Sequence, residues 1–210
     1  MLVSYHAQVT TQALAGRFSP AALDTIITAN VRQDAARGQI GHPEYHFDDN
    51  AFEQGYAYQE AQRGIILRIL AKSDELLPAW RAFGRLIHSA QDFYAHSNYL
   101  ALWARQFSMD ESLPPPSRVD AMEKGLLTHP ALHSGRIYPA EVILWLLPFL
   151  KNWLYPRLPA DSHAKMNLDC PERGPLFPYA LEAARQRTIY EFELLGERLG
   201  DTDRERFQGS

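Results

Sequence analysis

The chain has 210 residues, of which 46% are hydrophobic, enough for one sizeable core in one large domain or at most two small ones. Its formal net charge of -4 argues against a general nucleic-acid-binding protein, because such proteins are usually basic, but it does not exclude an enzyme that acts on a phosphodiester. A single cysteine, Cys170, excludes an intramolecular disulfide. The first residues lack the basic and apolar run of a signal peptide, so we expect a cytoplasmic protein or the mature form of a secreted one.

Apolar residues recur at helical spacing along most of the chain, and glycines and prolines separate the segments that carry them. Ser19 followed by Pro20 is a typical helix start, with serine as the N-cap and proline in the first turn. Gly55 and Gly64 are interpreted as points of close helix contact, because glycine otherwise weakens a helix. We expect helices over residues 2–16, 20–34, 52–72, 78–106, 139–154 and 176–199.

No segment shows the period-2 alternation that demands a strand, so the sequence predicts an all-α fold. We expect a single domain over residues 1–200, followed by a charged and frayed tail over residues 201–210. On the last helix we expect a solvated acidic face formed by Glu191, Glu193 and Glu197.

The most apolar segment, residues 142–150, is too short to span a bilayer and contains Pro148. We interpret it as part of a core helix. The alternative interpretation is a lipid-binding face, with interfacial anchors at Trp145, Phe149 and Trp153.

The pattern with the clearest chemistry lies in residues 83–100, where His88, Asp92 and His96 stand four residues apart. Successive steps of four on an α-helix leave neighbours about 40° apart, so these side chains share one stripe. Imidazole and carboxylate groups are the donors that zinc accepts, and the residues between them are mostly apolar. Two core histidines hydrogen-bonded to an aspartate would give the same pattern.

Further candidate metal ligands occur along the chain, whereas His42, His129 and His133 are interpreted as solvated. One zinc ion needs about four ligands, so this set is too large for one ion and suits two or three. Clustered metals are the usual apparatus for phosphate-ester hydrolysis. The candidates are His6, Asp34, His46, His88, Asp92, His96, His163, and either Asn167 or Asp169.

The segment LIHSAQDFYAHSNYL, residues 86–100, resembles the central motif of Het-C-like proteins, which are similar to the zinc-dependent phospholipase C and single-strand nuclease superfamily. Other segments agree in order: the residues around His6, FSPAALDTIITANVRQD ending in Asp34, EYHFDD around His46, and SHAKMNLD from Ser162 to Asp169. The resemblance covers roughly residues 4–192. It implies an all-α fold of that type with a trinuclear zinc cluster.

Carried over by position, the resemblance implies one zinc ion held by Asp34, His46, His88 and Asp92. Asp92 would bridge to a second ion that His6 also holds, and His96 and His163 would hold a third. Asp169 would replace the glutamate of the late motif, where this chain has Asn167. Asp34 is the expected catalytic residue, as the carboxylate that orients or deprotonates the attacking water.

The function that we expect is therefore zinc-dependent hydrolysis of a phosphodiester, either a phospholipid head group or single-stranded nucleic acid, with peripheral membrane contact as a further expectation. The alternative is a non-catalytic, zinc-stabilised helical module of the Het-C kind that acts through protein partners or membranes. Asn167, and the absence of a tryptophan near the start of the chain, favour this alternative.

Overall fold

The structure is a computed structural model that describes residues 1–35, 41–107 and 112–209, without the side chains of Trp145 and Pro148. Within these ranges the regular structure is helical, apart from two isolated β-bridges, which confirms the all-α part of the predicted fold class. The longer helices are α1 (Val3–Leu14), α2 (Pro20–Val31), α5 (Phe52–Lys72), α6 (Leu77–His96), α9 (Pro139–Leu146), α12 (Phe177–Glu197) and α13 (Asp201–Gln208). The short ones include η1 (Arg32–Asp34), α4 (Pro43–His46), α7 (Tyr99–Ala104), α8 (Lys124–Leu127), α10 (Lys151–Leu154) and α11 (His163–Met166).

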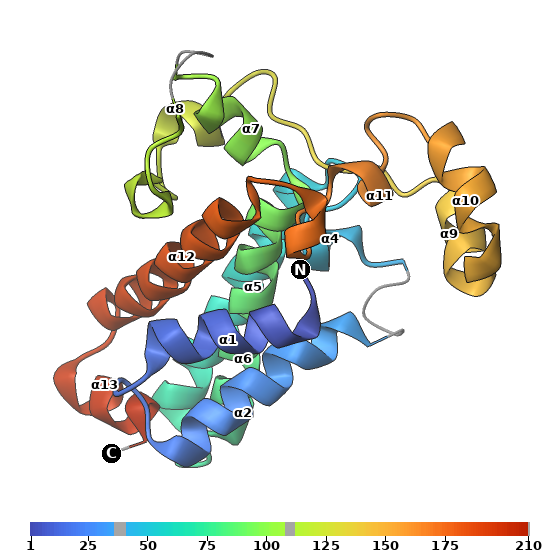
Figure 1. Cartoon of the computed structure of the whole chain (residues 1–210). Coiled ribbons are helices and arrows are strands. Elements are labelled where there is room, and N and C mark those ends of the chain that lie inside the picture. Colours follow the sequence, from blue (N-terminus) through green and yellow to red (C-terminus); the bar gives the residue numbers. More distant parts are fainter. Residues whose placement is uncertain (36–40, 108–111, 210) are drawn as a thin grey trace.

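Helix α6 is the centre of the bundle, and α2, α5 and α12 all pack against it (Figure 1). Every residue from Leu86 to His96 is buried, so this helix has no solvent-facing side over its second half. The expected helix over residues 78–106 is interrupted after His96, because Ser97 adopts an extended conformation and its hydroxyl donates to the carbonyl of Phe93. The chain then resumes as α7.

Gly84 sets the distance between α2 and α6. A Cβ atom at this position would lie 2.8 Å from the Cβ of Ala29 and would clash with the carbonyl oxygen of Ile26. This close approach brings the end of α2 against the half of α6 that carries the histidines. The expected contact at Gly55 is confirmed, since its Cβ would lie 2.7 Å from the Phe47 ring, but Gly64 has no such neighbour.

The end of the chain corrects one expectation. Residues Asp201–Gln208 form α13 instead of a frayed tail, because Phe207 is buried among Phe18 and Phe83 at ring-centroid distances of 5.3 and 5.5 Å. Trp80 also donates its indole N–H to the carbonyl of Phe207 at 2.7 Å. One aromatic side chain therefore anchors a segment that is otherwise strongly charged.

The expected solvated face of α12 is also wrong at one position. Glu191 is fully buried and accepts hydrogen bonds from Arg63 at 2.7 Å and from Arg187 at 2.7 Å. The charge-assisted bond from Arg63 joins α5 to α12, whereas the bond from Arg187 lies within α12. Glu193 is exposed, as expected.

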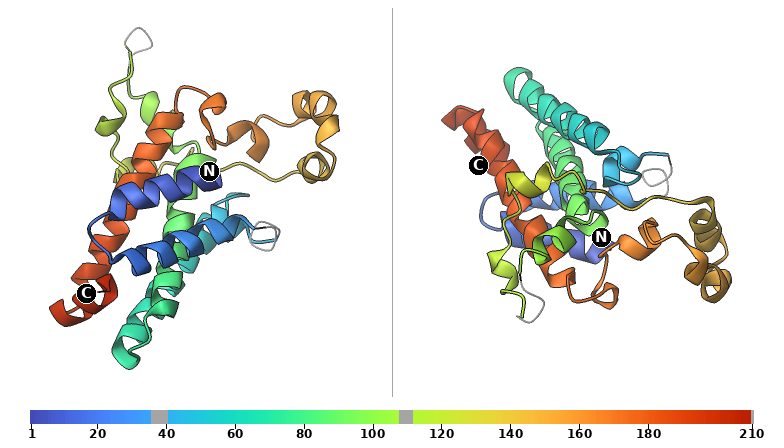
Figure 2. Two further views of the ribbon diagram at one scale, coloured as in Figure 1. Left: turned by 60° about the horizontal axis from the view of Figure 1, so that its bottom comes forward. Right: turned by 90° about the horizontal axis from the view of Figure 1, so that it is seen from above.

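The apolar segment after residue 138 is not a core helix. The expected helix over residues 139–154 divides at Pro148 into α9, a 3₁₀ turn (Pro148–Leu150) and α10. These short helices project from the bundle, as both views in Figure 2 show. In the part of the chain that the structure describes, no helix is both long and apolar enough to cross a membrane.

The contact at Gly84 gives a prediction with an internal control. We expect Gly84→Ala to destabilise the protein by about 1–3 kcal/mol, because the new methyl group overpacks the α2–α6 contact. Gly64→Ala should instead stabilise it by up to about 1 kcal/mol through helix propensity. Urea unfolding of both variants measures these changes, and equal effects at the two glycines would contradict the packing argument.

Candidate metal centre

The buried carboxylate of Asp92 is the meeting point of the site. One oxygen, Oδ2, lies 2.8 Å from His46 Nδ1 and 3.0 Å from His88 Nε2. The other, Oδ1, lies 2.6 Å from the amino group of Met1 and 3.1 Å from His6 Nε2. Groups from segments far apart in the sequence thus contact a single carboxylate.

The first ligand group consists of His6, Asp34, His88 and Asp92. Each offers one donor atom, and these atoms all lie within 4.8 Å of one another. Helix α1 supplies His6, η1 supplies Asp34 at the end of α2, and α6 supplies the other two from adjacent turns. His6, His88 and Asp92 are fully buried, whereas the Asp34 side chain is 11% exposed.

The second ligand group consists of Asp48, His96 and His163, whose donor atoms also lie within 4.8 Å of one another. Asp48 Oδ1 is 3.2 Å from His96 Nδ1 and 3.8 Å from His163 Nε2. His96 occupies the last turn of α6, and His163 begins α11. The two groups approach each other across α6, where His96 Nε2 lies 3.8 Å from Asp92 Oδ1.

Asp48 was not among the ligands predicted from the sequence. It sits in a tight turn after α4, where Phe47, Asp49 and Asn50 have positive φ angles. The turn is held in place because Asp49 accepts from the N–H of Ile137 and Asn50 accepts from that of Ser134. A sequence signal did exist, since consecutive Asp and Asn residues favour left-handed turns that can present a neighbouring carboxylate.

The remaining predicted ligands lie beside these groups. His46 contacts Asp92, as described above, and its carbonyl accepts from His96 Nδ1 at 3.0 Å. Asp169 Oδ1 is 3.2 Å from His96 Nε2 and 2.9 Å from the Met1 amino group. All predicted site residues therefore converge, whereas the alternative Asn167 uses its amide N–H to bond the carbonyl of His163.

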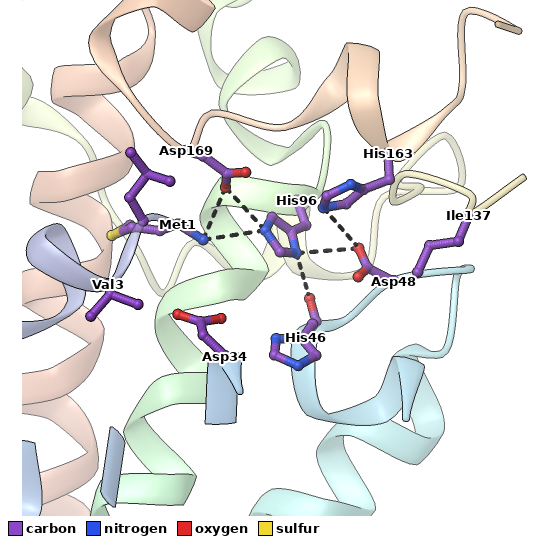
Figure 3. Close-up of a pocket in the computed structure, with 10 residues that line it drawn as sticks. Met1, Val3, Asp34, His46, Asp48, His96, Ile137, His163 and Asp169 are labelled. Carbon is purple, nitrogen blue, oxygen red and sulfur yellow. Dashed lines mark hydrogen bonds and ion pairs between the residues drawn. The ribbon is translucent and has the colours of Figure 1, made fainter. Parts of the chain in front are cut away.

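A pocket of about 200 Å³ opens onto this constellation. Its walls contain Asp34, His46, Asp48, His96, His163 and Asp169, and its rim is apolar, with Leu2, Val3 and Ile137 (Figure 3). His6, His88 and Asp92 do not line it. The first group is thus closed except at Asp34, whereas every member of the second group faces the pocket.

Hydrogen bonds on the far side of the imidazoles fix their orientation. His6 Nδ1 lies 2.6 Å from the amide oxygen of Gln91, and His88 Nδ1 lies 3.2 Å from that of Asn30. Facing an acceptor, each Nδ1 is the donor, and the lone pair of each ring is on Nε2, toward Asp92. The Gln91 amide in turn donates to Thr10 and Thr188 at 3.0 Å each. Such outer partners are what fix metal-binding histidines elsewhere.

The pKa values of the buried groups are shifted in different directions. Burial lowers the pKa of His88 well below its usual value, so its imidazole is a neutral electron-pair donor. Burial would raise the pKa of Asp92, but the Met1 amino group and His96 hold it well below its usual range. For Asp34, burial and the neighbouring Asp92 raise the pKa of the carboxyl.

Several atoms of the site that could ligate a metal ion lack a hydrogen-bond partner among the described residues. They are His6 Nε2 and Asp34 Oδ2 in the first group and Asp48 Oδ1 in the second. The 3.1 Å approach of His6 Nε2 to Asp92 is a close contact without hydrogen-bond alignment. Buried polar atoms without partners are costly, and here they belong to a set of imidazole nitrogens and carboxylate oxygens that suits a divalent cation.

Comparison with known proteins gives a different family from the one that the motif indicated. The family model that matches is the VWA7 N-terminal domain, over residues 3–118, which is more than half of the chain. The expected resemblance to Het-C-like proteins and the phospholipase C and nuclease superfamily is therefore wrong, and the ligand assignment implied by it loses that support.

Curated relatives agree with this family. The chain is 35% identical over 86 residues to von Willebrand factor A domain-containing protein 7 of Rattus norvegicus, and 34% identical over 86 residues to that of Mus musculus. Each match covers 41% of this chain but 10% of the relative, so the similarity concerns a small part of a much longer protein. No solved structure matches the chain.

The orienting network gives a prediction that does not depend on a metal. We expect Gln91→Leu to destabilise the chelator-treated protein by about 2–4 kcal/mol, because His6, Thr10 and Thr188 lose their buried partner. The exposed Gln12→Leu on α1 is the control and should change stability by less than about 0.5 kcal/mol. Urea unfolding decides, and a neutral Gln91→Leu would show that the network does not hold the histidines.

Proposed function

We propose that this chain, which belongs to the VWA7 N-terminal domain family, binds two or three zinc ions and uses them to hydrolyse a phosphodiester. The observation that carries the proposal is the convergence of imidazole and carboxylate groups beside an open pocket, where His6 Nε2, Asp34 Oδ2 and Asp48 Oδ1 lack a hydrogen-bond partner among the described residues. The proposal rests on the chemistry of these side chains and not on the family name.

The charge of the cavity supports more than one cation. The carboxylates of Asp34, Asp48, Asp92 and Asp169 lie together, and the Met1 amino group is the only cationic group other than imidazoles that the described residues place on them. Burying this much negative charge without compensating cations is expensive. A mixed set of imidazole nitrogens and carboxylate oxygens favours zinc over magnesium or calcium, which prefer oxygen alone.

The two ligand groups suit different roles. The first group offers four protein donors and is almost completely enclosed, which is typical of structural zinc sites. The second group offers three protein donors, and all of them face the pocket, as in catalytic sites that keep one coordination position open. We therefore assign the chemistry to the side of Asp48, His96 and His163.

A bound zinc ion would supply an acidified water and a positive charge beside the phosphoryl oxygens. The chain's own side chains would orient the attacking water and accept its proton. Asp34 is the one member of the first group that lines the pocket, and its Oδ2 has no partner among the described residues. It is thus placed to accept a proton from water and to orient that water toward the substrate.

The pocket also indicates what part of a substrate it admits. A volume of about 200 Å³ suits a phosphate group with its immediate substituents, so the rest of the molecule lies on the apolar rim. The rim residues Leu2 and Val3 are 51% and 48% exposed, and the chain carries a net charge of -4. These features favour a phospholipid head group over single-stranded nucleic acid, which would need a cationic groove.

A second function remains open because the first ligand group is so enclosed. Zinc bound there would stabilise the bundle without meeting a substrate, as in a non-catalytic module that acts through a partner. The two proposals differ in turnover, not in metal content.

Metal removal tests both proposals at once. Protein purified without chelator should contain two or three zinc ions per chain by plasma mass spectrometry. Removing them with EDTA should lower the Tm by roughly 8–16 °C, since binding at 1,000 times Kd contributes about 4 kcal/mol. Asp92→Asn should bind less metal and lose most of this response, whereas His129→Ala, outside both groups, should retain it. Metal-free protein, or an unchanged melt after verified removal, would refute the zinc centre.

Turnover distinguishes the enzyme from the module. The zinc-loaded protein should hydrolyse bis-nitrophenyl phosphate, EDTA should abolish the activity, and zinc should restore it. Asp34→Asn should lower kcat by about 10²–10⁴, the range for loss of a general base, and its metal content is measured alongside. Phosphatidylcholine and single-stranded DNA are assayed next to each other to identify the substrate class. Full metal content without turnover of any of these would establish the non-catalytic module.

A further inference from the structure

A helical arm, residues 138–162, leaves the bundle and returns to the same place. At its base Arg136 donates its N–H to the carbonyl of Asp161 at 2.8 Å, and His163 donates to the carbonyl of Arg136 at 2.8 Å. The hydroxyl of Tyr138 also donates to Asp161 at 2.9 Å. The arm extends away from the bundle as α9 and α10 on the right of Figure 1, and both views in Figure 2 show it projecting.

Large apolar side chains on this arm are open to solvent. Phe149 is 77% exposed, Leu146 is 74% exposed and Trp153 is 57% exposed. Val142, Ile143 and Leu147 on the same arm are 40–42% exposed. The described part of the bundle exposes few others, among them Leu2 and Val3 at the pocket rim. Exposed large apolar side chains gathered on one short segment mark a candidate site of interaction.

The charge of the arm indicates which kind of surface binds it. Residues 142–160 contain no acidic side chain, and they contain Lys151 and Arg157 in a chain whose net charge is -4. The acidic residue at the start of the arm, Glu141, is buried and accepts from the N–H of Ala164. The tip of the arm is therefore apolar and cationic. Anionic lipid surfaces attract that combination through the hydrophobic effect and through charge.

The aromatic and helical details fit a lipid interface better than a protein groove. The guanidinium of Arg157 lies 4.6 Å from the centroid of the Trp153 ring, so an interfacial aromatic and a cation are placed side by side. Pro148 and Pro156 limit the helices to one or two turns, which are too short to enter the hydrocarbon core as a span. The side chain of Trp145, also expected as an anchor, lies outside the described residues.

We propose that the arm of residues 138–162 binds the surface of an anionic lipid bilayer, with Leu146, Phe149 and Trp153 inserted at the level of the head groups. Ile137 and His163, which flank the arm, also line the pocket of the candidate metal centre. When the arm binds a lipid surface, the pocket would therefore lie next to that surface. Membrane binding requires neither bound zinc nor turnover, so it is tested separately from the proposed function.

The experiment is co-sedimentation of the full chain with vesicles, in the presence of EDTA and again with zinc. We use vesicles of phosphatidylcholine and phosphatidylserine at 7:3, and vesicles of phosphatidylcholine alone. The chain should bind the anionic vesicles more tightly, and binding should weaken as salt is raised. The double variant Leu146→Glu, Phe149→Glu should bind at least about 100-fold more weakly, because two large apolar side chains no longer insert.

Two further variants separate the contributions. Lys151→Gln with Arg157→Gln should weaken binding to anionic vesicles by about 30-fold, at about 1 kcal/mol for each cation, and should leave binding to phosphatidylcholine nearly unchanged. Gln12→Glu with Gln54→Glu places the same two negative charges on exposed positions of the bundle. This control should bind within a few-fold of the unmodified chain. Thermal melts confirm that each variant is folded.

Other outcomes overturn the proposal. It fails if the unmodified chain does not sediment with anionic vesicles, or if the Leu146→Glu, Phe149→Glu variant binds as well as the control. Sedimentation velocity without lipid tests the other occupant: a dimer that this variant abolishes would assign the arm to a second copy of the chain. Loss of hydrolysis with membrane binding intact would refute the proposed function and leave the arm's role standing.

Discussion

The fully buried carboxylate of Asp92 is the constraint on which the rest of the structure depends. An ionised group in the interior requires hydrogen-bond donors or cations around it, and the amino group of Met1 lies 2.6 Å from Asp92. The imidazoles of His6, His46 and His88 also lie within 3.1 Å of this carboxylate. Because those groups come from separate segments, the start of the chain, α4 and α6 must meet at one point. The bundle is arranged so that they do.

The hydrophobic core is divided by this polar centre. One apolar cluster, which includes Phe93, Tyr94 and Tyr99, surrounds the carboxyl-terminal part of α6, and a second, which includes Ile26 and Phe83, surrounds its first half. Between them lies the network of Gln91, Asn30 and the histidines, in which His6 Nε2 lacks a hydrogen-bond partner among the described residues. His6 Nε2, Asp34 Oδ2 and Asp48 Oδ1 are the buried atoms of the two ligand groups without a hydrogen-bond partner among the described residues, and they are where we propose that cations bind.

Local periodicity explains what the sequence predicted well. The helical fold and the stripe of His88, Asp92 and His96 follow from spacing along one helix, which a single segment determines. Asp48 was missed because its role depends on a turn held by Ser134 and Ile137, far away in the sequence. The motif also indicated the wrong family, since a short ligand pattern constrains a site more than it constrains ancestry. Apolar composition likewise could not tell a core helix from the arm, because exposure depends on which neighbours arrive.

The family match covers the whole of the first ligand group but only Asp48 and His96 of the second. Residues 3–118 contain the whole enclosed group, His6, Asp34, His88 and Asp92, whereas His163, Asp169 and the arm lie beyond the match. The enclosed group is therefore a property of the matched helices themselves, packed around α6. The open group needs His163, which begins α11 at the point where the arm rejoins the bundle. The apolar arm and the pocket therefore meet at His163, which follows the arm in the chain and completes the open group.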